Sequence, residues 1–243
     1  MPNTILRFYN EVDPTRALNQ ETLRIKDILH LFEPGNSARF LDIGCYDGSK
    51  TMALATHMHA QEVCGVDFLS ERLEQARERG IEIKVADLNA QEPLPYLDGY
   101  FDCIFVGDVI EHLFSPDFLL MEICRLLRQG GYAVLTTPNL ASWRNRIALL
   151  LGWQPFGTEV STRYRVGNPR APRGMPSGHI RVFTASALGD LVQYYGLRTE
   201  RLAGLTLGGQ RTGLERLTTL VDSGLLRLRS TLCDELVIKV RRQ

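Results

Sequence analysis

The sequence predicts an α/β fold in which a doubly wound, parallel sheet is covered by helices on both faces. Short apolar runs alternate along the chain with segments whose apolar residues recur at helical spacing. Strands and helices that alternate in this way form parallel sheets with right-handed crossovers. Polar residues recur where successive apolar runs end, and open α/β sheets bind their ligands at this carboxyl edge. The sequence therefore predicts a fold and the edge at which its site lies.

The expected strands are short and mostly apolar. The first ends at Asp42, and further strands are expected at 63–67, 81–85, 101–106, 132–137 and 235–240. Apolar runs of this length, bounded by turn residues, are typical of strands that are buried on both faces of a sheet. We therefore expect one domain over residues 1–243, with a cofactor-binding core over 38–137 and a C-terminal helix and strands over 184–243.

The helix boundaries are indicated by capping residues and glycines. Apolar residues at near-helical spacing predict an N-terminal helix over 15–32. Ser-Pro-Asp at 115–117 is a typical helix start, and a late helix is expected to begin near Thr184. Gly130 and Gly131 are expected to stop the helix that begins at 115–117, because paired glycines commonly end helices.

A glycine turn follows the first expected strand. Gly44 and Gly48 lack a Cβ, so the chain can turn sharply and ligand atoms can approach the backbone. Amide groups at the start of the next helix are then expected to point toward the ligand. Asp42 adds a negative charge, which would repel a pyrophosphate but suits a ligand that carries an ammonium group. The turn thus favours S-adenosylmethionine (SAM) over a dinucleotide, with a purely structural turn as the alternative.

Acidic residues end the next strands. Asp67 follows the second strand, where a carboxylate can hold both hydroxyls of a ribose, and the adjacent Phe68 can lie against an adenine. Asp87 follows the third strand and can accept a hydrogen bond from an exocyclic amine. The predicted cofactor-binding residues are Asp42, Gly44, Cys45, Tyr46, Gly48, Asp67, Phe68, Asp87, Leu88 and Asp108.

Six segments resemble motifs of the class I SAM-dependent methyltransferases, particularly the bacterial group that includes ubiquinone-type O-methyltransferases. They are Leu-Asp-Ile-Gly-Cys at 41–45, Gly-Val-Asp at 65–67, Ala-Asp-Leu at 86–88, the approach to the fourth strand at 93–102, Glu-His-Leu at 111–113 and Leu-Leu-Arg-Gln-Gly-Gly at 126–131. The resemblance implies a Rossmann-like, seven-stranded sheet with an antiparallel last strand, and SAM as the cofactor. Tyr46 departs from the pattern, because the family usually has glycine there, so the cover of the ligand's methionine end is expected to differ.

Residues 138–183 form a long connection that the core fold does not require, and such a connection is usually a lid or a binding element. From 138 to 181 it contains one acid, Glu159, and seven arginines, at positions 144, 146, 163, 165, 170, 173 and 181. Because arginine favours carboxylate and phosphate oxygens, we expect this lid to cover a small-molecule acceptor and recognise an anionic group on it. A solvated loop is the alternative. Nucleic acid is not expected, because no motif for it accompanies the arginines.

Two histidines are the catalytic candidates. A hydroxyl acceptor must lose its proton close to the moment of methyl transfer, and an imidazole with an ordinary pKa of about 6.5 suits that role. His112 follows the fourth strand, where the methyl group is expected, and His179 lies at the end of the arginine-rich segment. Either can instead be structural. Asp108, Glu111 and His112, at i, i+3 and i+4, can also converge on a divalent metal, which we do not favour.

Composition indicates an ordinary globular chain. Of the 243 residues, 44% are hydrophobic and 23% are charged, and the formal net charge is zero, which gives no electrostatic reason to expect a polyanionic partner. The five cysteines are scattered without a Cys-x-x-Cys pair, and no segment has the pattern of a secretory leader or a membrane span. We therefore expect a cytoplasmic protein without disulfides or a zinc site.

Three classes of function fit these features. The favoured class is an enzyme that methylates a hydroxyl oxygen of a small molecule. The second is a methyltransferase-fold partner protein, because residues 138–152 resemble a stretch of MetW-type methionine-biosynthesis proteins, whose function involves assisting an acyltransferase. A nicotinamide-dependent oxidoreductase is the third and is disfavoured, since the turn lacks the Gly-x-Gly-x-x-Gly pattern and has an acid where a pyrophosphate would lie.

Overall fold

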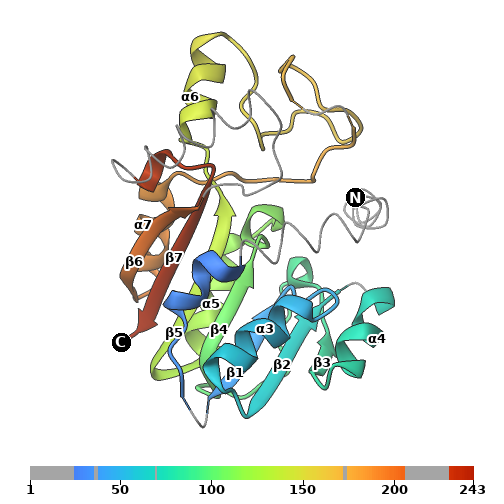
Figure 1. Ribbon diagram of the computed structural model, residues 1–243, viewed down its shortest axis with the longest axis vertical. Coiled ribbons are helices and arrows are strands. Elements are labelled where there is room, and N and C mark those ends of the chain that lie inside the picture. The colour runs from blue at the N-terminus through green and yellow to red at the C-terminus, as the bar shows by residue number, and fades with distance from the viewer. Residues whose placement is uncertain (1–24, 36–37, 69, 172–173, 206–229) are drawn as a thin grey trace.

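A seven-stranded sheet with strand order β3-β2-β1-β4-β5-β7-β6 forms the centre of the protein (Figure 1). The computed structural model describes residues 25–35, 38–68, 70–171, 174–205 and 230–243. The strands are β1 Arg39–Ile43, β2 Glu62–Asp67, β3 Glu82–Val85, β4 Phe101–Gly107, β5 Leu127–Pro138, β6 Leu197–Leu205 and β7 Glu235–Arg242. The predicted α/β sheet is therefore confirmed.

The pairing of the strands defines where a ligand can lie. β1 pairs in parallel with β2 and with β4, and the parallel part of the sheet continues to β3 on one side and β5 on the other. β7 is antiparallel to both of its neighbours, β5 and β6, which confirms the predicted antiparallel last strand. The strand order reverses between β1 and β4, and open sheets bind ligands at the carboxyl ends of strands beside such a reversal.

The helices begin where capping residues allow them to. They are α3 Ser49–Met58, α4 Ser70–Glu78, α5 Pro116–Leu126, α6 Trp143–Leu150 and α7 Ala185–Tyr194, with single 3₁₀ turns η1 Leu29–Leu31, η2 Leu88–Ala90, η3 Ile110–His112 and η4 Ser230–Leu232. The Ser115 hydroxyl accepts from the Phe118 amide before α5, and the Thr184 hydroxyl accepts from the Ala187 amide before α7. Both helix starts lie where the sequence predicts them, because a side-chain oxygen satisfies an otherwise unpaired amide.

Two hydrophobic cores hold the sheet, one on each face. Helices α5 and α7 pack on one face, and α3 packs on the other together with residues 25–32. Side chains alternate between the faces along β4, so that Ile104 joins the first core while Cys103 and Phe105 join the second. Burying a large aliphatic side chain stabilises a fold by about 1.5–3 kcal/mol, so these cores keep the carboxyl edge of the sheet in place.

Two helix boundaries differ from the sequence-based expectation. α5 ends at Leu126 and β5 begins at Leu127, so Gly130 and Gly131 lie inside the strand and do not stop a helix. Glycine suits this position, because a Cβ on Gly131 would lie 2.9 Å from the Arg128 carbonyl oxygen where the β4–β5 register shifts. Of the helix expected over 15–32, the structure describes the part from residue 25 onward, and the earlier part lies outside the described residues.

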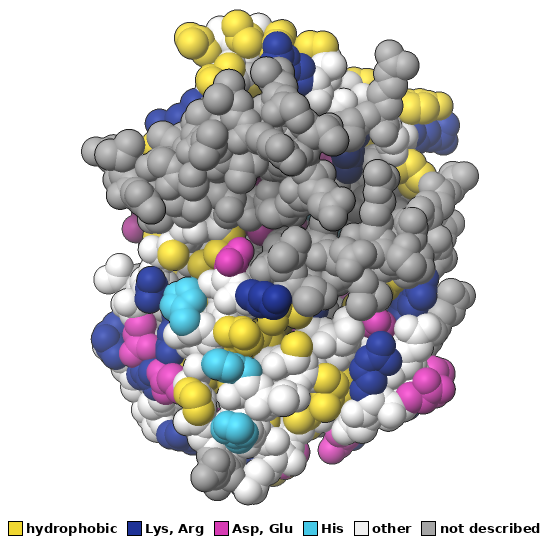
Figure 2. All heavy atoms as spheres, viewed as in Figure 1, with side chains coloured by type: hydrophobic (Ala, Val, Ile, Leu, Met, Phe, Trp, Pro, Cys, Tyr) yellow, Lys and Arg dark blue, Asp and Glu magenta, His cyan; other side chains and the backbone are white. Residues whose placement is uncertain are grey.

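The segment that follows β5 extends above the carboxyl edge of the sheet (Figure 1). It contains α6 and returns to the core through a bridge between Asn139 and Phe183. Figure 2 shows hydrophobic side chains gathered at this end of the molecule, where the exposed hydrophobic residues of α6 and the residue after it are Ile147, Leu149, Leu150 and Leu151. Among the described residues, no helix has the length and hydropathy that crossing a membrane requires.

Candidate functional site

A cavity of about 370 Å³ lies at the carboxyl edge of the sheet, between the strand ends and the lid. Seven of the ten predicted cofactor-binding residues contribute to its wall: Gly44, Tyr46, Asp67, Phe68, Asp87, Leu88 and Asp108. His112 and His179 contribute to the same wall. Asp42, Cys45 and Gly48 do not line it, so any role of these three in binding would be exerted through the shape of the turn or from beneath it.

The glycine turn is held against its neighbours by steric fit. Gly44 has φ +86°, and a Cβ on it would lie 2.3 Å from Cγ2 of Val109, the second residue after β4. The amides of Gly44 and Cys45 both donate to the carbonyl oxygen of Val66, at 2.7 and 3.2 Å. These two amides therefore fasten the turn to β2 and are not available to a ligand, whereas the prediction for the amides at the start of α3 stays a prediction.

Tyr46 adopts the left-handed conformation that glycine adopts most readily, with φ +50°. Its amide donates to Oδ2 of Asp67 at 2.9 Å, and the Arg72 guanidinium lies 5.5 Å from the centre of its ring. A left-handed residue other than glycine costs roughly 1–2 kcal/mol. This explains the family's usual glycine, and it shows that the tyrosine adds an aromatic side chain to the cavity wall at a backbone cost.

The acids at the ends of β2, β3 and β4 are fixed by donors on nearby turns or on the adjacent strand β5. Oδ2 of Asp67 accepts a hydrogen bond from the Tyr46 amide, and the Asp67 side chain is largely buried. Oδ1 of Asp87 accepts from the Asn89 amide at 2.8 Å, which caps η2. Oδ1 of Asp108 accepts from the Thr136 hydroxyl at 3.1 Å. The three carboxylates thus face one cavity from three successive strand ends, as their positions in the sequence predict.

Asp42 differs from its predicted role as a fixed negative charge. Its side chain is buried beneath the turn, and Oδ2 accepts from the Thr51 hydroxyl at 2.6 Å. Burial raises the pKa of Asp42 to about 7, because a carboxylate loses its hydration there. Oδ1 is buried and has no hydrogen-bond partner among the described residues. A cationic group bound nearby would therefore stabilise the ionised form of the Asp42 carboxyl group.

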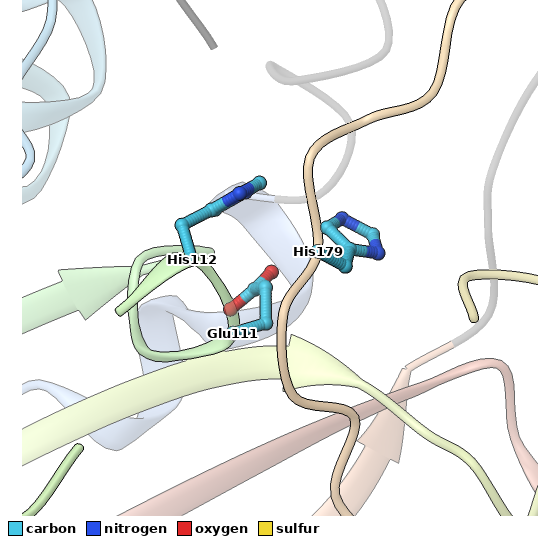
Figure 3. Close-up of side chains that lie close together, drawn as sticks. All are labelled: Glu111, His112 and His179. Carbon is cyan, nitrogen blue, oxygen red and sulfur yellow. The ribbon is translucent and has the colours of Figure 1, made fainter. Parts of the chain in front are cut away.

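The two candidate histidines lie against each other (Figure 3), with ring centres 4.9 Å apart. Nδ1 of His112 lies 3.1 Å from the carbonyl oxygen of Gly178, and Nδ1 of His179 lies 2.9 Å from that of Gly157. A carbonyl oxygen only accepts, so each Nδ1 must carry a proton. In a neutral ring Nε2 then has its lone pair available, which is the form that a general base requires.

Burial lowers the pKa of His112 to about 4, and the neighbouring His179 ring acts in the same direction. The ordinary pKa expected from the sequence is therefore wrong. The physical reason is that a charged imidazole at this buried position would lack hydration and would lie beside a second imidazole. His112 is thus neutral at physiological pH, with no proton on Nε2.

Glu111 holds the lid to the core rather than facing the ligand. Its backbone oxygen accepts from the amides of Ile180 and Arg181, at 2.7 and 3.0 Å, and its fully buried carboxyl accepts from the Thr137 hydroxyl. Burial raises the pKa of Glu111 well above its ordinary value.

The residues considered from the sequence as a possible metal set are not the ones that the structure brings together. Potential ligand atoms of Glu111, His112 and His179 lie within 4.8 Å of one another, and Asp108 is not among them. The i, i+3, i+4 spacing does not converge, because Asp108 has left-handed backbone angles and is followed by a 3₁₀ turn and not by an α-helix.

Several lid arginines are already engaged by other groups of the protein, either within the lid or on the core. Arg144 pairs with Asp234 at 3.1 Å, Arg165 donates to the Ser177 hydroxyl at 2.7 Å, and Arg181 donates to a backbone oxygen. None of the six described arginines lines the cavity, and Arg173 lies outside the described residues. Arg144 and Arg165 line an adjoining cavity of about 310 Å³, which shares Glu159 and His179 with the first.

Sequence reasoning missed Glu159 and Gly178, whose functional contacts depend on the folded lid. Gly178 contributes only a carbonyl oxygen, which no sequence pattern reveals. Glu159 had one signal, since it is the single acid between residues 138 and 181.

The family to which the chain belongs follows from its match to a family model. A model described as a methyltransferase domain matches residues 17–202, which is more than half of the chain. The chain belongs to this methyltransferase family. An antiparallel β7 and a ligand cavity beside β1 and β4 are the features that the resemblance to class I enzymes implies.

Relatives agree with this membership. An uncharacterized 37.1 kDa protein in transposon TN4556 of Streptomyces fradiae is 36% identical over 112 residues, which are 44% of this chain and 31% of that protein. A ubiquinone biosynthesis O-methyltransferase of Maricaulis maris is 29% identical over 163 residues, covering 58% of this chain and 63% of the relative. The chain therefore spans less than two thirds of the length of either relative.

A solved structure supports the fold. A SAM-dependent methyltransferase from Thermotoga maritima, described as a possible histamine N-methyltransferase, superposes with a TM-score of 0.63 over 99% of both chains at 18% identity. The class I methyltransferase fold is thereby confirmed, and SAM is the cofactor that family and fold imply for the cavity. The site fits it, because the Asp67 and Asp87 carboxylates suit hydroxyl and amine donors, and Oδ1 of Asp42, beneath the turn, has no hydrogen-bond partner in the part of the chain that the structure describes.

Proposed function

We propose that this methyltransferase transfers the methyl group of SAM to a hydroxyl oxygen of a small molecule, with His112 as the general base. One observation carries the proposal: Nδ1 of His112 donates to Gly178, so Nε2 is unprotonated in the cavity that Asp67 also lines. The O-methyltransferase activity named for the Maricaulis maris relative supports oxygen as the methylated atom.

The chemistry assigns separate tasks to the two sides of the cavity. SAM supplies a methyl group on a positively charged sulfur. The acids at the strand ends orient the cofactor, while lid and strand residues exclude water and align the acceptor oxygen, which is most of what an in-line displacement requires. Nε2 of His112 accepts the hydroxyl proton as the new carbon–oxygen bond forms.

The low pKa of His112 determines when the proton moves. Proton transfer before methyl transfer costs about 1.4 kcal/mol for each unit by which the pKa of the acceptor hydroxyl exceeds that of the base. A base with a pKa of about 4 therefore cannot easily deprotonate a free alcohol or phenol. The oxygen becomes strongly acidic once it starts to bond to the methyl carbon. His112 therefore accepts the proton during methyl transfer, when even a weak base suffices.

The lining of the cavity indicates the kind of acceptor. Phe114, Val160 and Ile180 contribute apolar wall on the lid side, which suits an aromatic or aliphatic body. An anionic group on the acceptor would extend into the adjoining cavity, where Arg165 lies.

If an anionic group binds there, Arg165→Ala should raise the acceptor's KM severalfold. Arg163→Ala, which changes an exposed side chain, should leave the KM unchanged. Equal KM values for both variants and wild type would remove the anionic group from the proposal.

Calorimetric titration with SAM, S-adenosylhomocysteine and NAD tests the cofactor. We expect SAM and its product to bind and NAD not to bind. Asp67→Ala should weaken SAM binding by about 1.5–3 kcal/mol, the loss expected when hydrogen bonds at a charged group are removed. Unchanged affinity in the variant would remove Asp67 from the ribose site.

Turnover distinguishes an enzyme from a partner protein of the MetW type. With isotope-labelled SAM and a panel of phenols and sugar hydroxyls, we expect label to move to an oxygen of at least one acceptor. Tight SAM binding without transfer to any member, together with capture of an acyltransferase, would favour the partner-protein function.

All five cysteines are free thiols, which supports a reducing compartment such as the cytoplasm.

A further inference from the structure

We propose that Glu159 is a positioning residue that sets the tautomer of His112 by holding lid residues 177–181 in place. The inference concerns a carboxylate that the sequence motifs do not single out. Its effect on turnover rests on the proposed function of His112, whereas its effect on the His112 tautomer does not.

The Glu159 carboxylate binds three consecutive backbone amides of the lid. It accepts from Ser177, Gly178 and His179 at 2.5, 2.7 and 3.3 Å. Its side chain is only 10% exposed, so these bonds are shielded from water. Hydrogen bonds to an ionised acceptor are roughly twice as strong as neutral ones, and a carboxylate has enough lone pairs to accept all three.

The same short segment is bound from the opposite side by the core. The amides of Ile180 and Arg181 donate to the backbone oxygen of Glu111, which lies immediately before His112. Five consecutive amides, from 177 to 181, are thus satisfied by two glutamates, one through its side chain and the other through its backbone. The carbonyl of Gly178 lies within this span and accepts from Nδ1 of His112 at 3.1 Å.

The tautomer of His112 depends on that carbonyl. While Gly178 accepts from Nδ1, the ring proton stays on Nδ1 and Nε2 can accept a proton from an acceptor hydroxyl. If residues 177–179 move away, the proton can transfer to Nε2, the nitrogen that free neutral histidine favours. The ring would then donate where the proposed reaction requires it to accept.

A carboxylate is required here because all three partners are donors. In Glu159→Gln the side chain keeps its length, but its NH₂ group must face one of the backbone amides or turn away from them. Arg165 lies 3.8 Å from the carboxylate and also donates to the Ser177 hydroxyl, so the same cation contacts both Glu159 and the segment that Glu159 binds. The segment is therefore secured by an acid with a cationic neighbour.

The test reads the tautomer directly by NMR of the full chain labelled with ¹⁵N-histidine. Two-bond correlations between ring protons and nitrogens distinguish the protonated from the unprotonated nitrogen, and a His112→Asn sample assigns the His112 signals. We expect wild type to show the proton on Nδ1 of His112. Glu159→Gln should show a mixture of tautomers or a proton on Nε2, together with faster hydrogen exchange at the amides of 177–179.

Controls separate this effect from a general loss of charge or fold. Glu78→Gln removes an exposed carboxylate on α4, away from the cavity, and should leave the His112 spectrum unchanged. Glu159→Asp keeps the charge and should restore part of the wild-type tautomer population. If Glu159→Gln fails to fold, Glu159→Asp compared with wild type provides the same measurement on a smaller scale.

Turnover is measured on the same variants with SAM and an accepted hydroxyl compound. Misplacement of about 1 Å can cost up to about 100-fold in rate, so we expect kcat of Glu159→Gln to fall by about 10-fold to 100-fold with SAM affinity near wild type. A changed tautomer with unchanged kcat would support the positioning role and contradict His112 as the base. A wild-type tautomer and wild-type amide exchange in Glu159→Gln would overturn the proposal, whatever the rate.

Discussion

The cofactor side of the cavity and the lid side are built by different kinds of contact. On the cofactor side the polar groups are fixed by the edge of the sheet, as when Asp87 accepts from the Asn89 amide and Asp108 accepts from a hydroxyl on the adjacent strand β5. On the lid side the decisive contacts join distant parts of the chain, as when His112 donates to Gly178, 66 residues away. The comparison teaches that sheet topology positions the residues predicted to bind the cofactor, whereas the proposed base, His112, meets its hydrogen-bond partner only after the lid has folded onto the core.

The largest predicted effect tests the rigidity of the cofactor side. Gly44→Ala should lower the free energy of unfolding by about 3 kcal/mol, because its Cβ would lie 2.3 Å from Val109 and its φ is left-handed. Gly152→Ala is the matched lid variant, with φ +72° and open space around its Cβ, and should cost only the backbone term of about 1–2 kcal/mol. Urea denaturation measures both values. Equal costs would show that the two sides do not differ in packing.

The next prediction concerns the burial of His112 under the lid. Its pKa is about 4 in the folded protein and about 6.5 in the unfolded chain, so the unfolded state binds a proton first as the pH falls. Relative to His112→Asn, wild type should therefore lose about 1.6 kcal/mol of stability between pH 6.5 and pH 5.

Urea denaturation of both proteins across this pH range provides the measurement. The raised pKa of Asp42 acts in the opposite sense over the same range, but Asp42 is present in both proteins and cancels in the difference. A difference that does not change with pH would mean that His112 is solvated and the lid is not closed over it.

A smaller effect is expected at Tyr46, where the cofactor side contains backbone strain. Tyr46→Gly should be more stable than Tyr46→Ala by about 1 kcal/mol, because only glycine adopts φ +50° without cost. Thermal or urea denaturation of the pair measures the difference, and both variants lose the ring equally. If alanine proved the more stable residue here, the turn would not have left-handed geometry in solution.

The sequence predicts the cofactor side well because its signals are local. Asp67, Asp87 and Asp108 each follow an apolar run, and parallel strands place those ends at one edge, so their approach to one cavity could be expected. Gly48 does not line the cavity, and the motif does not reveal its packing, in which a Cβ would lie 2.4 Å from Ile81. Asp42 shows what a sequence motif cannot predict, because the motif does not indicate how deeply a side chain is buried, and burial determines its pKa.

The lid could be predicted as a segment but not as a set of contacts. Its arginine content indicated an anion site, yet Arg144 is paired with Asp234, 90 residues later in the chain. His179 was identified as a candidate, and its contact with His112 explains part of the low pKa, which required the folded structure. Long-range pairings of this kind leave no spacing pattern, so residues such as Glu159 are found only from coordinates.

The central claim, that a neutral His112 accepts the acceptor's proton, is tested most directly by the pH dependence of kcat in wild type and His112→Asn. Asparagine can still donate to the Gly178 oxygen but offers no base in place of Nε2. The account predicts that His112→Asn lowers kcat by about 10² to 10⁴ while SAM affinity stays near wild type. It also predicts that wild-type activity declines only near pH 4, with no such decline in the variant. Full kcat in His112→Asn at neutral pH would contradict the account and leave catalysis to alignment alone.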